Sequence, residues 1–229
     1  MHLDVGRLDE AEADMRAALA DSMAAGQPAP LAGVGQLVLV FVERGALADA
    51  QALLAEHGLE GELPEQMVLN PLLHARASLR IAQRRWAESE ADARELGRRH
   101  ERWGMRRPSP NWRALAAEAR WADGDGAAAR ELAESSLELA RTWGTAKAIA
   151  IALRARAMTG ADEERRVDLE QALGVLEGTP WRLDTARAGV DLGAALRRAG
   201  RRRQAREHLL AAMDQACLLY TSPSPRDRS

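Results

Sequence analysis

The five histidines are the first residues in this sequence that could do chemistry, because imidazole ligates metals and transfers protons near neutral pH. None of them stands in an H-E-x-x-H arrangement or at another familiar metal-ligand spacing; they are His2, His57, His74, His100 and His208. No nucleophile, base and oxyanion donor stand together in a recognisable pattern either. We therefore predict no metal site and no catalytic residues, expect the protein not to be an enzyme, and place each histidine on a helix surface.

A phosphate-binding loop is the second kind of site to consider. A Walker A loop needs a glycine directly before its lysine, and Lys147, the only lysine, stands in "WGTAKA". The "GVG" of Gly33 to Gly35 begins like a dinucleotide fingerprint, but Val38 occupies the third glycine position and no strand precedes it. We expect a loop entering a helix there, and no cofactor.

Six tryptophans supply nearly all of the aromatic side chains. Trp103 and Trp143 stand forty residues apart, each directly before a glycine, which is where a residue that packs a helical hairpin would stand. Trp121 and Trp181 follow no such pattern. We predict that these two contribute to a surface for a protein partner or a small-molecule inducer.

Two arginine-rich stretches could contact acidic groups. Residues 84–107 begin with Arg84 and Arg85 and mix both charge signs along a helix, which is typical of a solvated face. Partner binding at Arg84 and Arg85 is the alternative. Residues 197–206, "RRAGRRRQAR", place six arginines around an expected turn, where we favour a solvated turn over phosphate contact.

An internal repeat must position all of these residues. Similar segments recur along the chain; the first is "GRLDEAEADMRAAL" and the last is "GRRRQAREHLLAAM". Successive segments start 36 to 40 residues apart, at Gly6, Gly45, Arg84, Gly124, Gly160 and Gly200. A fixed period near 40 indicates stacked helical hairpins. The five glycines among the starts are the predicted structural turn positions, because glycine tolerates the positive φ that ends a helix.

Small and apolar residues recur at helical spacing after each start. Alanine stands five residues after four of the starts, where it would let two helices approach closely: Ala11, Ala50, Ala129 and Ala205. A second glycine, which would end the second helix, follows three of the starts by twenty residues: Gly26, Gly104 and Gly144. We therefore predict an all-α fold, a right-handed solenoid of about six tetratricopeptide-like hairpins over residues 1–216.

The composition fits this architecture. Of the 229 residues, 46% are hydrophobic and 29% charged, as in a globular chain. The formal net charge of -2 gives no general reason to expect nucleic-acid or membrane binding. The longest apolar run, residues 37–42, is far below the ~20 residues that a membrane span needs. With one cysteine and no apolar leader, the sequence predicts a cytoplasmic protein.

The last repeat carries a more specific resemblance. "LGAALRRAGRRRQAREHLLAA", Leu192 to Ala212, resembles a tetratricopeptide repeat, and the segment Val175 to Ala216 is similar to the final helical repeats of LuxR-type, MalT-like ATPase transcriptional regulators. The resemblance implies a sensor segment for signal transduction, which binds a protein partner or inducer and couples it to ATPase and helix-turn-helix domains outside this sequence. This segment itself would not contact DNA. A free-standing tetratricopeptide-like scaffold for protein binding is the alternative.

The final residues break the repeat. The pattern expects a glycine near position 220, where the chain has Tyr220, and Cys217 to Asp227, "CLLYTSPSPRD", resembles a translated sequencing adapter. We predict that residues 217–229 form a non-native, disordered tail. Only five residues precede Gly6, so the first hairpin would lack most of its first helix, and we expect the sequence to be a fragment truncated at both ends.

Overall fold

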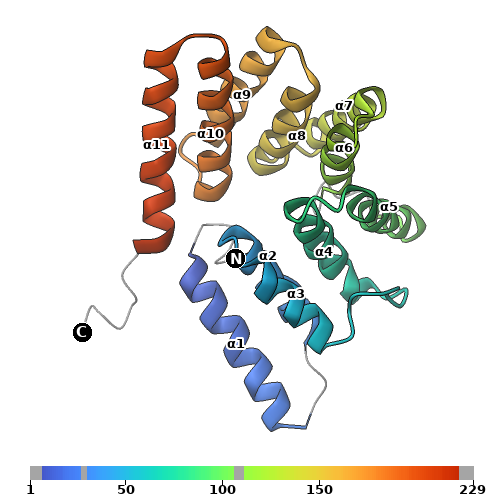
Figure 1. The fold of residues 1–229 in the computed structure, drawn as a ribbon. Helices are drawn as coiled ribbons and strands as arrows, with labels where there is room; N and C mark the ends of the chain where they lie inside the picture. The colour runs from blue at the N-terminus through green and yellow to red at the C-terminus, as the bar shows by residue number, and fades with distance from the viewer. Residues whose placement is uncertain (1–6, 27–29, 106–110, 222–229) are drawn as a thin grey trace. The chain divides into compact units, whose positions relative to one another are not determined.

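The protein is all-α over the residues that the structure describes, which are 7–26, 30–105 and 111–221 (Figure 1). This computed structural model has eleven α-helices and one short 3-10 helix in those ranges. Contacts divide the chain into two compact units. The first is Asp9–Gly124, and the second is Asp125–Ser229 together with Met1–Leu8. The predicted all-helical architecture is therefore confirmed.

The first unit holds the helices that precede Gly124. These are α1 (Leu8–Ala24), α2 (Leu31–Glu43), α3 (Leu47–Glu56), η1 (Met67–Leu69), α4 (Asn70–Ala82), α5 (Trp86–Arg102) and α6 (Trp112–Ala122). Helices α2 and α3 pack together as one hairpin and α4 and α5 as the next. Because α3 also packs on α4 and α5 on α6, the helices from α2 to α6 each meet their neighbours in sequence, as in a helical repeat.

Helix α2 lies at the centre of the apolar core of this unit. Its buried residues include Val34, Leu37 and Val38, which belong to one cluster with leucines of α3 and α4. Gly33 and Gly35 lie inside α2 rather than in a loop before it, because the helix already begins at Leu31. A Cβ on Gly35 would lie 3.2 Å from the Cα of Leu72, so this glycine lets α2 approach α4 closely. The "GVG" is therefore a packing element.

The second unit holds the remaining helices. These are α7 (Gly126–Trp143), α8 (Ala146–Thr159), α9 (Asp162–Leu176), α10 (Arg182–Arg198) and α11 (Arg202–Thr221). Helix α8 packs on α7, α9 and α10, and it buries alanine on several faces: Ala148, Ala150, Ala152, Ala155 and Ala157. Helices α10 and α11 form the last hairpin. Small side chains let α8 have three helical neighbours at once.

The predicted turn glycines behave alike with one exception. Gly45, Gly124 and Gly200 have φ of 71°, 94° and 76°, as expected. Gly160 ends α8 in an extended conformation with φ -84°. It differs because α9 begins at once, with the Glu164 carboxylate accepting a hydrogen bond from the backbone N–H of Ala161. The fifth predicted turn, at Gly6, lies outside the described residues.

Two further predictions from the repeat agree with the structure. The alanines five residues after each turn are all buried: Ala11, Ala50, Ala129 and Ala205. The second glycines all adopt positive φ: Gly26, Gly104 and Gly144. Small residues thus stand where helices meet, and glycines where helices end.

The end of the chain differs in part from the predicted disordered tail. The backbone of residues 217–221 continues α11, which ends at Thr221. These residues contain no helix breaker, and the first proline of the tail comes only at Pro223. Residues 222–229 lie outside the described part of the chain, and the adapter origin of the tail stays a prediction.

Candidate interaction surfaces

Arg84 and Arg85, two of the predicted surface residues, lie in the turn between α4 and α5. Arg84 is exposed and has φ 61°, the conformation that glycine adopts at the same place in other repeats. Arg85 donates to both carboxylate oxygens of Glu88, from Nε at 2.7 Å and Nη2 at 2.5 Å. It also donates to the side-chain oxygens of Gln51 and Gln83. The Arg85 hydrogen bond lowers the pKa of Glu88, so this group is already neutralised within the fold.

Trp121 and Trp181, the other two predicted surface residues, lie in different surroundings. Trp121 is near the end of α6 and 41% exposed. Trp181 directly precedes α10, packs against the core of the second unit and lies under Lys147, whose Nζ is 5.0 Å from the ring centroid. The structure therefore leaves Trp121 as the more accessible of the two indoles.

The two tryptophans that were expected to pack hairpins also differ in how far they are buried. Trp143 is 46% exposed, so its predicted packing role is wrong, whereas Trp103 is partly buried. The structure gives the packing role to Trp112 instead. Its indole fills the space beside Gly97 on α5 and joins the core of the first unit. A glycine facing a tryptophan across two helices leaves no local sequence signal.

A buried ion cluster in the first unit overturns the prediction of a purely solvated charged face. Asp92 on α5 is 4% exposed and accepts hydrogen bonds from Arg76 at 2.8 Å (Nε) and from Arg80 at 2.6 Å (Nη1). The same two arginines donate to main-chain oxygens of the loop between α3 and α4: those of Leu59, Glu60 and Gly61. Burial lowers the pKa of Arg80. The depression beside this cluster holds only about 10 Å³, no more than about one water.

Two further residues of α5 are buried against expectation. Arg99 donates to the main-chain oxygens of Leu63 and Pro64, which extends the arginine contacts along the same loop. His100, predicted on a helix surface, is 2% exposed, and its Nε2 has no hydrogen-bond partner among the described residues. Burial and the nearby Arg113 guanidinium lower the pKa of the imidazole.

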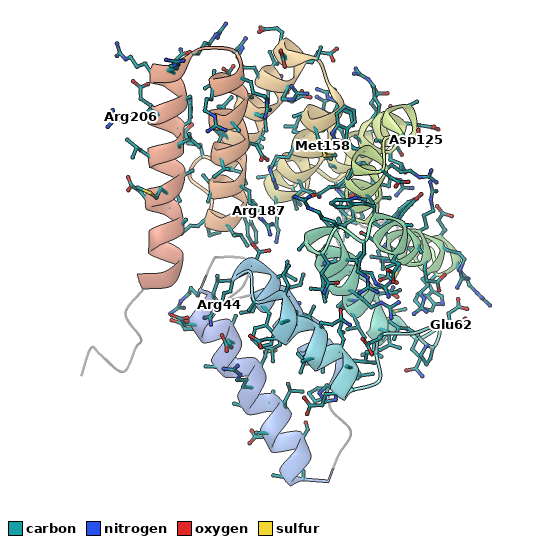
Figure 2. The ribbon with its side chains drawn as sticks, in the orientation of Figure 1. Arg44, Glu62, Asp125, Met158, Arg187 and Arg206 are labelled. Carbon is teal, nitrogen blue, oxygen red and sulfur yellow. The ribbon has the colours of Figure 1, made fainter. Side chains whose placement is uncertain are left out.

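The second unit has a groove along its last hairpin. It has a volume of about 360 Å³ and is lined by Arg197 of α10 and by one stripe of α11: Arg202, Ala205, Arg206, Leu209, Leu210 and Met213. A volume of this size lies in the range of known binding pockets. Figure 2 shows Arg206 on α11. The arginine-rich turn is therefore solvated, as predicted, but three of its arginines also border an apolar surface.

Local packing explains why the groove is open. Ala205 is buried and Leu209 half-buried because they face α10, where a Cβ on Gly193 would lie 2.5 Å from the Cγ of Leu209. Leu210 and Met213 continue the apolar stripe beyond this contact and are 46% and 54% exposed. The sequence signal was a stripe on α11 too wide for one neighbouring helix to cover.

Neither a metal site nor a membrane span is found within the described ranges. Their histidine, cysteine, aspartate and glutamate side chains form no group of three that could hold a metal ion. Of the helices searched there, none combines the length and apolar character needed to cross a bilayer.

Comparison with known proteins supports the fold. No family model matches the chain, and no curated protein matches it by sequence. Among solved structures, the crystal structure of BtubC (BKLC) from P. vanneervenii is similar over 96% of this chain and 95% of that one, with a TM-score of 0.58 and 17% sequence identity. The chain therefore has an all-α fold of sequential helical hairpins that resembles a tetratricopeptide-like helical-repeat protein.

Proposed function

We propose that this chain is a helical-repeat scaffold for protein interaction. The α10–α11 groove carries the proposal, because it exposes large apolar side chains that the packing of the unit does not require. The likeness to BtubC supports it, since stacked helical hairpins offer extended surfaces to partners. The ion clusters elsewhere hold the fold together, as the contacts of Arg76 and Arg80 illustrate.

Position-specific photo-crosslinking in source cells tests this function. A photoreactive amino acid replaces Leu210 in the groove and, as a matched control, Val167 on α9, which is 36% exposed and outside the groove. A protein adduct of defined mass that forms at position 210 and not at position 167 supports a scaffold. Identical adduct patterns at both positions, or none at position 210, would contradict it.

The more specific role as the sensor of a LuxR-type regulator rests on the resemblance of Val175 to Ala216. No family model supports that assignment, so it stays a prediction. Amplifying the gene from source DNA, with primers inside the codons for residues 182–215, tests it. An open frame that continues into a helix-turn-helix, with a Walker A loop upstream, supports the regulator. A frame without them favours the free-standing scaffold.

A further inference from the structure

We propose that the α10–α11 groove binds an acidic amphipathic helix of a protein partner. The proposal rests on the scaffold function and names the chemistry of its partner. Leu209, Leu210 and Met213 form an apolar floor that spans about one turn of α11. A partner helix would cover such a stripe with its own apolar side chains at i, i+3, i+4 and i+7.

The rim of the groove has a single charge sign. Arg197, Arg202 and Arg206 are exposed, and within the described part of the chain no hydrogen bond or ion pair engages their side chains. Arg203, by contrast, is paired with Glu207 through Nε and Oε1 at 3.1 Å and does not line the groove. The groove therefore presents unneutralised guanidinium groups, which attract carboxylates and can bind them in a bidentate way.

Spacing on α11 fits two carboxylates of one helix. Arg202 and Arg206 are four residues apart and so lie one turn apart on the same side of α11. Glutamates one turn apart on a partner helix have the same separation. Arg197 reaches the groove from α10 and adds a third positive group to its rim. The partner's acidic residues would thus flank its apolar stripe.

An apolar floor distinguishes this ligand from nucleic acid. Phosphates would satisfy the arginines but leave the exposed side chains of Leu210 and Met213 in contact with water. An acidic amphipathic helix satisfies the arginines and buries these side chains as well. The combination of rim and floor therefore favours a protein ligand.

Fluorescence anisotropy with the full chain tests the proposal. The probe is a labelled peptide of about 16 residues, roughly four helical turns, with a leucine stripe flanked by glutamates. Its control is a scrambled peptide of the same composition. We expect saturable binding of the probe only, and binding that weakens as salt is added. Equal binding of both peptides, or none of either, would overturn the proposal.

Matched variants locate the site. Replacing both Arg202→Glu and Arg206→Glu should raise the Kd of the probe roughly tenfold or more, whereas Arg203→Glu, one residue away and outside the groove, should change it less than about twofold. All three positions are exposed, so thermal unfolding by circular dichroism should show each variant folded. A probe with lysines in place of glutamates should bind the double variant better than the original protein, which a merely structural role would not produce.

Two outcomes separate this inference from its rivals. Leu210→Ser with Met213→Ser should weaken binding of the glutamate probe, because it removes the apolar floor. If a DNA duplex binds with the same arginine dependence while these serine variants leave both ligands unaffected, the groove is a phosphate site and the proposal fails. A crosslinked partner at position 210, without binding of the acidic probe, would retain the scaffold and reject only the acidic ligand.

Discussion

Gly97 of α5 and Trp112 of α6 are complementary in shape: a Cβ added to Gly97 would lie 2.5 Å from Cε2 of the indole. The indole therefore occupies the space that any other residue at position 97 would need. The contact lies between α5 and α6, which pack against each other.

Gly97→Ala should destabilise the protein by about 1–3 kcal/mol, because the new methyl group overlaps the ring and forces the helices apart. Gly174→Ala is the control. Gly174 lies inside α9, and a Cβ added to it would meet nothing within 4 Å, so alanine there should stabilise by about 0.5–1 kcal/mol. Urea unfolding followed by circular dichroism measures both. Equal effects of the two alanines would show that the indole does not restrict position 97.

Arg84→Gly should stabilise the first unit by about 1 kcal/mol, because glycine relieves the left-handed conformation that arginine adopts at φ 61°. Ala82→Gly, two residues earlier at the end of α4, should instead destabilise by up to about 1 kcal/mol. Thermal unfolding of the two variants checks the opposite signs. A loss of stability in Arg84→Gly would contradict the expected strain.

Asp92→Ala should destabilise by about 3–5 kcal/mol, because it leaves two buried guanidinium groups without their carboxylate. Glu88→Gln supplies the comparison. Its partner Arg85 is partly exposed and the Glu88 side chain is 48% exposed, so the loss of stability in Glu88→Gln should stay below about 1 kcal/mol. Chemical denaturation measures the free energy of unfolding of both variants. Similar losses in the two would show that burial of the Asp92 cluster adds nothing to stability.

Acid should weaken the fold through His100. Its pKa is lowered in the folded state, so the unfolded chain binds the proton more readily. Stability is therefore complete above the ordinary histidine pKa of about 6.5 and falls as the pH drops below it. Urea midpoints at pH 7.5 and pH 5.5 measure this loss, and His100→Gln should reduce it. An unchanged pH dependence in that variant would assign the loss to other groups.

Much of the fold could be predicted because its signals are local. The turn glycines and the buried alanines five residues later depend on helix ends and on helix contacts within one repeat, and Gly45 with Ala50 shows both in one place. The ion cluster could not be predicted in this way. Asp92 belongs to a mixed-charge stretch that resembles a solvated helix, and only the position of a loop from the preceding repeat shows that it and Arg76 are buried.

The candidate groove could likewise be predicted only in part. The sequence indicates a charged turn at the arginines around Gly200, but it does not distinguish Leu210 and Met213, which are exposed, from the other members of an apolar stripe. Which apolar residues stay exposed depends on how far α10 extends over α11. That is a property of packing rather than of periodicity, so the sequence alone predicts a surface at Trp121, Trp181, Arg84 and Arg85 instead.

Arginine side chains hold the loop between α3 and α4 through hydrogen bonds to its backbone. Arg76, Arg80 and Arg99 bind its main-chain oxygens, which every amino acid possesses. Substitutions in this loop that preserve the chain path therefore leave these contacts intact. Selection on the fold would act on the three arginines and on Leu59 and Leu63, which are buried in the core, while the exposed residues 60–62 and 64 would be free to diverge between related proteins. The loop can thus accumulate changes faster than the helices that hold it, and supply new surface chemistry without a change of architecture.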